Sequence, residues 1–83
     1  MQLNPDLIRR ITIETEKLTG GKVLDGIDGV SLEDFLAHVE WMRDAALIEV
    51  NIQKHLEGPP LALVFRLTWE GCNFLDSVRA DSL

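Results

Sequence analysis

Apolar residues recur at two different spacings along this chain. In two segments they fall at helical intervals, so that each segment has one apolar face. The first face holds Leu7, Ile8, Ile11, Thr15 and Leu18, and the second holds Leu32, Phe35, Leu36, Val39, Met42 and Ala46. From residue 48 the spacing changes to two, which is the period of a half-buried strand. The alternating apolar residues are Ile48, Val50 and Ile52, followed by Leu61, Leu63, Phe65 and Leu67. The pattern predicts two helices followed by a β-hairpin.

Residues that favour helix ends mark the boundaries. Asn4 precedes Pro5 and Asp6, and this order predicts a helix start, because Asn caps free amides and Pro fits the first turn. Gly20-Gly21 is expected to end that helix. Ser31 predicts the start of the second helix, with Asp34 at the position that a capping box would use.

A third helix is predicted after the hairpin. Thr68 is its expected cap, and Leu75 and Val78 are expected to point inward with Phe74 beside them. Gly71 falls in its first turn, where glycine lowers helix propensity, and close packing against a neighbouring element is the usual compensation.

The order of elements predicts the fold class. A helix, a brief extended stretch at 22–24, a helix, a hairpin and a helix follow one another. One arrangement satisfies this order: an α+β domain with helices packed on a small antiparallel sheet, whose hairpin protrudes as a wing. We expect residues 1–83 to form a single domain, because so short a chain supports one small core.

The composition of the chain limits which cellular compartment and which binding partners are compatible with it. The chain has 14 acidic and 8 basic residues and a net charge of −6, so phosphate repels it at long range unless basic residues are concentrated locally. Cys72 is the single cysteine and cannot form an internal disulfide. No apolar run reaches the ~18–20 residues that span a bilayer, and the N-terminus lacks a secretion signal pattern. We therefore expect a cytoplasmic protein with no membrane contact.

Two stretches resemble parts of winged-helix proteins. "HVEWMRDAALIEV" resembles the H-x-x-x-L-x-x-A-G-L-I ending of a recognition helix, and "RLTWEGCNFLDSVRAD" resembles the L-T-x-x-G-x-x-F-L helix that follows a wing. Over residues 5–81 the chain is similar to a small winged-helix family, a domain of unknown function, common in phages and prophages. The matching residues are His38, Met42, Ala45, Leu47 and Ile48, then Thr68, Gly71, Phe74 and Leu75.

The sequence departs from this family at two places. Ala46 stands where glycine is usual, which bears on the left-handed turn that glycine permits. The segment 20–30 is short for the first helix of a full helix-turn-helix. The resemblance therefore implies a compact, reduced winged helix, and such a fold does not by itself confer DNA binding.

The outward side of the second predicted helix is acidic and carries a tryptophan. Its residues are Glu33, Asp34, Ala37, Glu40, Trp41 and Asp44, with His38 at the border. A helix that reads DNA normally presents Arg, Lys, Asn, Gln, Ser or Thr. Trp41 among acids has the composition of a protein-contact anchor. Alternatively, Trp41 folds over Val23-Leu24 or Ile27 and belongs to the core.

Two functions are compatible with these residues. The first is a non-catalytic interaction module, of the phage or prophage accessory type, that binds a protein partner or itself through Trp41 and the acids around it. The second is a DNA-binding regulator that acts as a dimer, with phosphate contacts from Arg9, Arg10, Lys54 and Arg66. An anionic surface could also serve as a decoy for another protein's DNA site.

Candidate catalytic chemistry is sparse. His38, His55 and Cys72 are isolated in sequence and lack the spacing of zinc ligands or of a nucleophile and its base. For Cys72 we favour burial over an activated thiol at the helix start. The carboxylates lie on one convex helix face and Gly20-Gly21 lacks a phosphate-loop context. We therefore expect no enzyme, no sizeable cleft, no metal, no cofactor and no small-molecule substrate.

Overall fold

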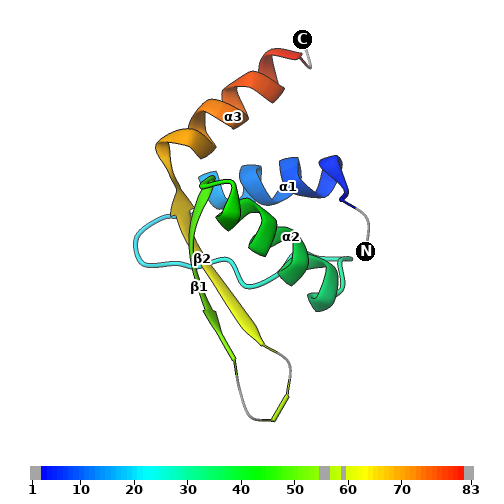
Figure 1. Ribbon diagram of the computed structural model, residues 1–83. Helices are drawn as coiled ribbons and strands as arrows, with labels where there is room; N and C mark the ends of the chain where they lie inside the picture. The colour runs from blue at the N-terminus through cyan, green and yellow to red at the C-terminus, as the bar shows by residue number, and fades with distance from the viewer. Residues whose placement is uncertain (1–2, 55–56, 59, 82–83) are drawn as a thin grey trace.

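The computed structural model describes residues 3–54, 57–58 and 60–81, apart from the side chains of residues 80 and 81. Within these ranges three helices and two strands follow one another. In chain order they are α1 (Pro5–Glu16), α2 (Leu32–Asp44), β1 (Ile48–Gln53), β2 (Leu61–Leu67) and α3 (Trp69–Asp81). Figure 1 shows α1 and α2 side by side, while the strands of the hairpin and α3 extend in opposite directions. The α+β class with a small antiparallel sheet is confirmed.

The first two predicted helix starts are confirmed. The Asn4 side chain accepts hydrogen bonds from the Asp6 and Leu7 amides, and Pro5 occupies the first turn of α1. The Ser31 hydroxyl accepts a hydrogen bond from the Asp34 amide at 3.1 Å. The end of α1 differs from the expectation, because the helix stops at Glu16, before the two glycines.

The apolar face of α2 is narrower than the spacing predicts. Phe35, Val39 and Met42 are buried, whereas Leu32 is 56% exposed and Ala46 is exposed. Leu32 is the first residue of the helix and borders a shallow groove toward the end of the hairpin, so the sheet does not cover it. Ala46 lies beyond the helix end and so is not on the helical face.

The end of α2 keeps a left-handed turn without glycine. Ala46 has φ 60°. Its amide donates to the Arg43 carbonyl and the Leu47 amide donates to the Met42 carbonyl, both at 2.9 Å. This pair of bonds is a Schellman motif. Ala46 therefore adopts the left-handed turn that glycine would normally permit, at a cost in backbone strain.

The hairpin contains a bulge that reverses the apolar face of β2. Ile48 pairs with Leu67 and Glu49 with Arg66, but Val50 pairs with Val64, so Phe65 is the extra residue. Beyond the bulge Ala62 and Val64 are buried, whereas Leu61 and Phe65 are exposed. The alternation at Leu61, Leu63 and Phe65 thus marks the outer face of β2, opposite the core. On the far side of β2, Leu24 pairs with Val64 through two hydrogen bonds of 2.9 Å, and this bridge lies in the predicted extended stretch.

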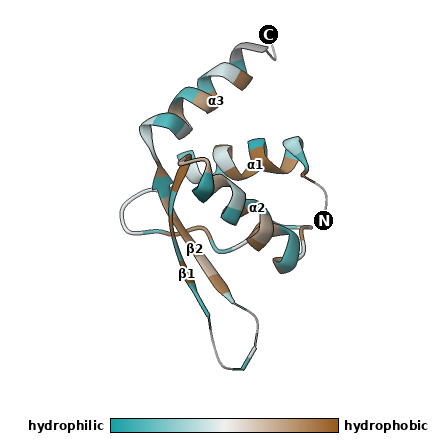
Figure 2. Cartoon of the chain, in the orientation of Figure 1, coloured by the Kyte–Doolittle hydropathy of each residue, from teal (hydrophilic) through white to brown (hydrophobic). Residues whose placement is uncertain are grey.

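The core lies where α1, α2 and the inner side of the sheet meet. Figure 2 shows hydrophobic residues along β2 and on the sides of the helices that face it. The buried apolar cluster contains Leu7, Ile11, Ile27, Phe35, Val39, Met42, Ile48, Ala62 and Val64. Thr12 and Thr15 are buried as well, and each hydroxyl donates to the carbonyl four residues earlier. These bonds allow α1 to bury polar side chains without an unsatisfied donor.

The start of α3 is tied to the end of α2. The Thr68 hydroxyl accepts from the Gly71 amide at 3.0 Å and donates to the Ala46 carbonyl. A Cβ atom at Gly71 would lie 2.0 Å from the Leu47 carbonyl oxygen. The close packing predicted for Gly71 is confirmed, and Leu75 is buried one turn later as expected.

Candidate functional site

The surface we call the α2 face consists of Glu33, Asp34, Ala37, Glu40, Trp41 and Asp44. Its position follows from the buried side of the helix, since Phe35, Val39 and Met42 anchor α2 on the core and turn these six residues outward or to its edge. Glu33, Asp34, Trp41 and Asp44 are exposed, and Ala37 and Glu40 are half-buried. The six residues lie along one side of α2, as the sequence predicts, and form one convex strip.

Trp41 lies at one edge of the α2 face, above His38. The two ring centroids are 5.1 Å apart and the ring planes meet at 73°, an edge-to-face contact. Trp41 remains 37% exposed. The alternative reading, in which Trp41 is a core residue, is therefore wrong. Trp41 thus packs its ring against His38 and leaves part of its aromatic surface exposed to solvent.

His38 is a buried connection between α1 and α2. Its side chain is 2% exposed, and its Nε2 atom accepts a hydrogen bond from the Asn4 amide at 3.0 Å. Because Nε2 accepts, the ring proton resides on Nδ1, which donates to the Asp34 carbonyl at 2.7 Å. The expected border position of His38 is wrong. Its spacing from Phe35 and Met42, three and four residues away, places it on the buried side and would have identified it.

The carboxylates of the α2 face are largely unneutralised. Among the described residues, Glu33, Asp34 and Glu40 form no ion pair. Asp44 approaches only Arg43, at 3.9 Å with both side chains well exposed. Such an exposed ion pair contributes little to the stability of the protein. The α2 face therefore presents negative charge around an aromatic ring.

The four candidate phosphate contacts do not form one patch. Arg9 pairs with Asp6 at 3.3 Å, and Arg66 binds both carboxylate oxygens of Glu49 at 2.6 and 2.9 Å. Arg10 donates to the Asp28 carbonyl at 3.1 Å. Lys54 follows β1 near the hairpin tip, whereas Arg66 lies near the base of β2. Three of these cations are thus already engaged, on two separate elements.

The hydrogen bond between Glu49 and Arg66 changes the acidity of both groups. It lowers the pKa of Glu49 and raises the pKa of Arg66, and the attraction of the opposite charges acts in the same direction. Both groups stay charged near neutral pH.

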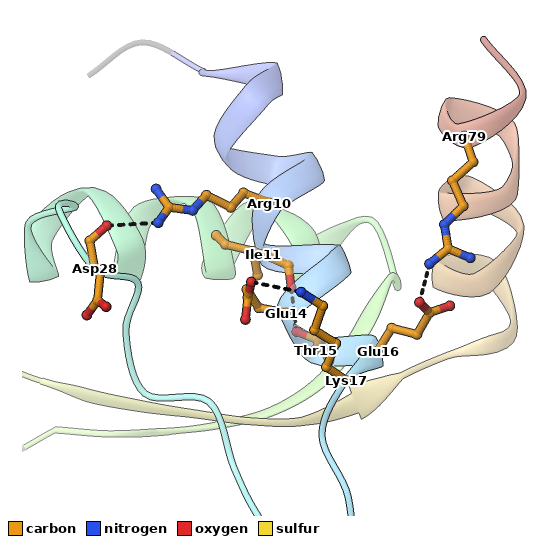
Figure 3. A network of polar contacts seen from close by, with 8 residues as sticks. All are labelled: Arg10, Ile11, Glu14, Thr15, Glu16, Lys17, Asp28 and Arg79. Atoms are coloured by element: carbon orange, nitrogen blue, oxygen red, sulfur yellow. Dashed lines mark hydrogen bonds and ion pairs between the residues drawn. The ribbon is translucent and has the colours of Figure 1, made fainter. Parts of the chain in front are cut away.

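Other polar contacts surround α1. Figure 3 shows Arg10 reaching Asp28, Lys17 near Glu14, and Arg79 of α3 paired with Glu16. Lys17 and Glu14 are 3.6 Å apart. The basic residues of α1 and of its C-cap, Lys17, thus contact acids or a carbonyl of the chain itself.

The residues considered for catalysis are scattered. Cys72 is exposed on α3, so the burial predicted for it is wrong. His55 falls outside the described residues. Across the ranges that the structure covers, no three His, Cys, Asp or Glu side chains converge in a way that could hold a metal ion.

A groove that the sequence did not indicate runs between α1 and α3. Its volume is about 370 Å³, contrary to the expectation of no sizeable cleft. The Asp6–Arg9 ion pair lies at its rim. The remaining lining is apolar and comprises Leu3, Pro5, Ile8, Leu47, Phe74 and Val78. The groove lies where α3 packs beside α1, and helical spacing alone does not specify how these two helices meet.

Within the described ranges, none of the helices combines the length and the apolar character that a bilayer crossing requires.

Comparison with known proteins identifies the family. A family model described as "Hypothetical protein (DUF2513)" matches residues 2–83. An "Uncharacterized protein" of Haemophilus influenzae is 33% identical over 87 aligned positions, which cover 100% of this chain and 72% of the relative. No solved structure matches the chain. The match over nearly all residues shows that the chain belongs to the DUF2513 family.

Proposed function

We propose that this protein is a non-catalytic winged-helix module that binds a protein partner through the α2 face. In this proposal it has an accessory or regulatory role of the type found in phages and prophages, and the family resemblance given above supports that role. The observation that carries the proposal is Trp41, 37% exposed and held edge-on by the buried ring of His38. A rigid, solvent-exposed aromatic side chain loses little conformational freedom on binding, so its burial contributes strongly to affinity.

The negative charge around Trp41 indicates that the matching surface of the partner is cationic. Glu33, Asp34 and Glu40 have no ion-pair partner among the described residues. A partner that places arginine or lysine against these acids gains electrostatic steering, and a guanidinium can stack on the Trp41 ring. Binding should therefore weaken as salt screens the charges.

The arrangement of elements supports the winged-helix part of the proposal. A hairpin follows α2 directly, and α3 returns from the hairpin to pack beside α1. The residues that carry the resemblance have packing roles here, since Thr68 caps α3 and Gly71 permits close contact with Leu47.

Capture of partners with tryptophan variants tests the proposal. Trp41→Ala should lose partners that the wild type retains from a host lysate. Trp69→Ala is the matched control, because Trp69 is 78% exposed on α3 and is not one of the six residues of the α2 face. Its loss therefore reports generic adhesion to an exposed aromatic side chain. Equal capture by wild type and Trp41→Ala, or equal losses in both variants, would contradict the proposal.

A charge-matched pair of variants tests the electrostatic part. The double variant Glu40→Gln, Asp44→Asn should bind a captured partner more weakly, by about 10-fold or more for charge pairs at an interface. The control Glu70→Gln, Asp76→Asn removes the same charge from α3. Equal weakening by both pairs would indicate an effect of net charge alone and would argue against the α2 face.

DNA binding remains the second candidate, because the family resemblance is to proteins that carry a recognition helix. Three of the four side chains that would contact phosphate already have a partner within the chain. Arg9 and Arg66 are in ion pairs and Arg10 is bound to a carbonyl. Binding to DNA would exchange these contacts for phosphate contacts beside an acidic helix.

A further inference from the structure

The outer edge of β1 has no neighbour in the described part of the chain. β1 pairs with β2 on one side, and β2 has Leu24 on its other side, so β1 is the edge of the sheet. The backbone hydrogen bonds that lie outside the helices and the hairpin involve none of residues 48–53. A strand edge exposes amides and carbonyls that can pair with another strand.

β1 lacks the features that normally protect an edge. Folded proteins block open edges with lysine, proline, a bulge or a very short strand. β1 is six residues long, reads IEVNIQ, and contains neither lysine nor proline. The extra residue of the bulge, Phe65, lies on β2. The edge is therefore regular enough to accept a second strand.

The one charge on β1 is neutralised within the hairpin. Arg66 of β2 holds the Glu49 carboxylate through two hydrogen bonds of 2.6 and 2.9 Å. Over residues 48–53, a second strand carrying the same sequence thus meets no net charge. This matters for self-pairing, because like charges directly opposite each other destabilise a sheet.

The inner side of β1 is incompletely covered. Ile48 is buried at the base of the strand, but Val50 and Ile52 are only half-buried, although both pack against the core. Figure 1 shows β1 and β2 extending beyond α1 and α2. A further strand at the edge would shield these two side chains from water, which is favourable for apolar surface.

We propose that β1 pairs antiparallel with β1 of a second copy of this chain, about a two-fold axis at Asn51. In this register Asn51 lies opposite Asn51 of the second copy. Glu49 lies opposite Gln53, and Val50 lies opposite Ile52. Polar residues then meet polar residues on the outer face, and apolar residues meet apolar residues on the inner face. The interface is self-complementary, as two-fold pairing requires.

This surface is separate from the α2 face, so the two proposals can fail independently. The competing mode of self-association is packing through the exposed apolar row on the outer face of β2. That row includes Leu61, Leu63 and Phe65. Asn51 and Leu63 are cross-strand neighbours in the hairpin, so matched substitutions at these two positions distinguish the two modes.

Analytical ultracentrifugation of the full chain tests the edge pairing. The wild type should sediment as a dimer. Asn51→Lys places two ammonium groups opposite each other at the axis and should give a monomer, as should Asn51→Asp, which preserves the side-chain shape. Leu63→Lys puts the same charge on the neighbouring strand and should leave the dimer intact. Circular dichroism establishes that each variant is folded.

Mixing the two Asn51 variants identifies the register. Lysine opposite aspartate is attractive, so a mixture of Asn51→Lys and Asn51→Asp should recover the dimer that neither forms alone. A monomeric wild type at concentrations of several hundred micromolar overturns the proposal. Loss of the dimer in Leu63→Lys but not in Asn51→Lys also overturns it and assigns association to the outer face of β2. Failure of the mixture to recover a dimer overturns the register at Asn51.

Discussion

Ala46 adopts a backbone conformation that L-amino acids rarely occupy. Its φ of 60° allows the Schellman bonds that end α2. A residue with a Cβ atom loses about 1–2 kcal/mol in this region relative to glycine. The strain persists because Thr68 and Leu47 hold both sides of the turn.

Ala46→Gly should stabilise the protein. Removing the Cβ atom relieves the left-handed strain, and the greater freedom of glycine in the unfolded chain offsets about 0.5–1 kcal/mol of that gain. We expect the free energy of unfolding in urea to rise by about 0.5–1 kcal/mol. The control is Ala45→Gly, whose φ of −82° carries no such strain, and this variant should be destabilised. A loss of stability in both variants would contradict the assignment of strain to Ala46.

Gly71→Ala should destabilise the protein by several kcal/mol, at the upper end of the range for point mutants. Its new Cβ atom would lie 2.0 Å from the Leu47 carbonyl oxygen, a backbone atom that cannot rotate away. Thermal or urea unfolding measures the effect. Gly26→Ala is the control, because its Cβ atom meets Leu32 at an ordinary 3.9 Å. That variant should be neutral or slightly stabilised, and equal behaviour of the two variants would refute the close approach.

At the scale of elements, His38 connects the beginning of α1 to the middle of α2. His38→Ala removes the acceptor of the Asn4 amide and the edge contact to Trp41. We expect the free energy of unfolding to fall by about 1–3 kcal/mol, the usual range for an unsatisfied buried group. In a Trp69→Phe background, the emission of Trp41 should also change. His38→Gln keeps an acceptor and should recover part of the stability.

If His38→Ala changes the free energy of unfolding by less than about 0.5 kcal/mol, as substitutions at surface positions usually do, the connection between α1 and α2 through His38 contributes little to stability.

The hairpin carries a pH-dependent ion pair at its base. Hydrogen bonding to Arg66 lowers the pKa of Glu49, so the charged carboxylate is favoured in the folded protein. The stabilisation is therefore present at pH values above the ordinary glutamate pKa and is lost as the pH falls through the lowered pKa. NMR titration of the Glu49 side-chain carboxyl should reveal the low midpoint, and Arg66→Gln should return it toward the ordinary value. An unchanged midpoint in Arg66→Gln would refute the pair in solution.

At the scale of the whole molecule, charge acts against binding to nucleic acid. The net charge is −6, and α2 presents acids where a DNA-reading helix presents donors and cations. We expect the wild type to shift no DNA duplex in an electrophoretic assay at about 50 mM salt, where non-specific phosphate contacts are strong. A shift that weakens with salt and is lost in Arg9→Gln, Arg10→Gln would favour the DNA alternative over the proposed partner binding.

Local signals in the sequence predicted most element starts and several packing details. Asn4, Ser31 and Thr68 each cap a helix where expected, because a cap depends on only three or four consecutive residues. Gly71 was predicted to mark a close approach, since a glycine inside a helix needs a compensating contact. The α2 face follows from the same kind of local information, because helical periodicity alone places its residues outward or at the edge.

What the sequence by itself determined is thus the order of elements, their class, their caps and the acidic outward side of α2. Only the tertiary structure decided which face of β2 is buried, because the bulge at Phe65 depends on how two strands pair rather than on either strand's alternation. The partial exposure of Trp41 and the pairing of Arg66 with Glu49 were also tertiary outcomes. Each depends on contacts between residues distant in sequence, and periodicity within one element carries no information about such contacts.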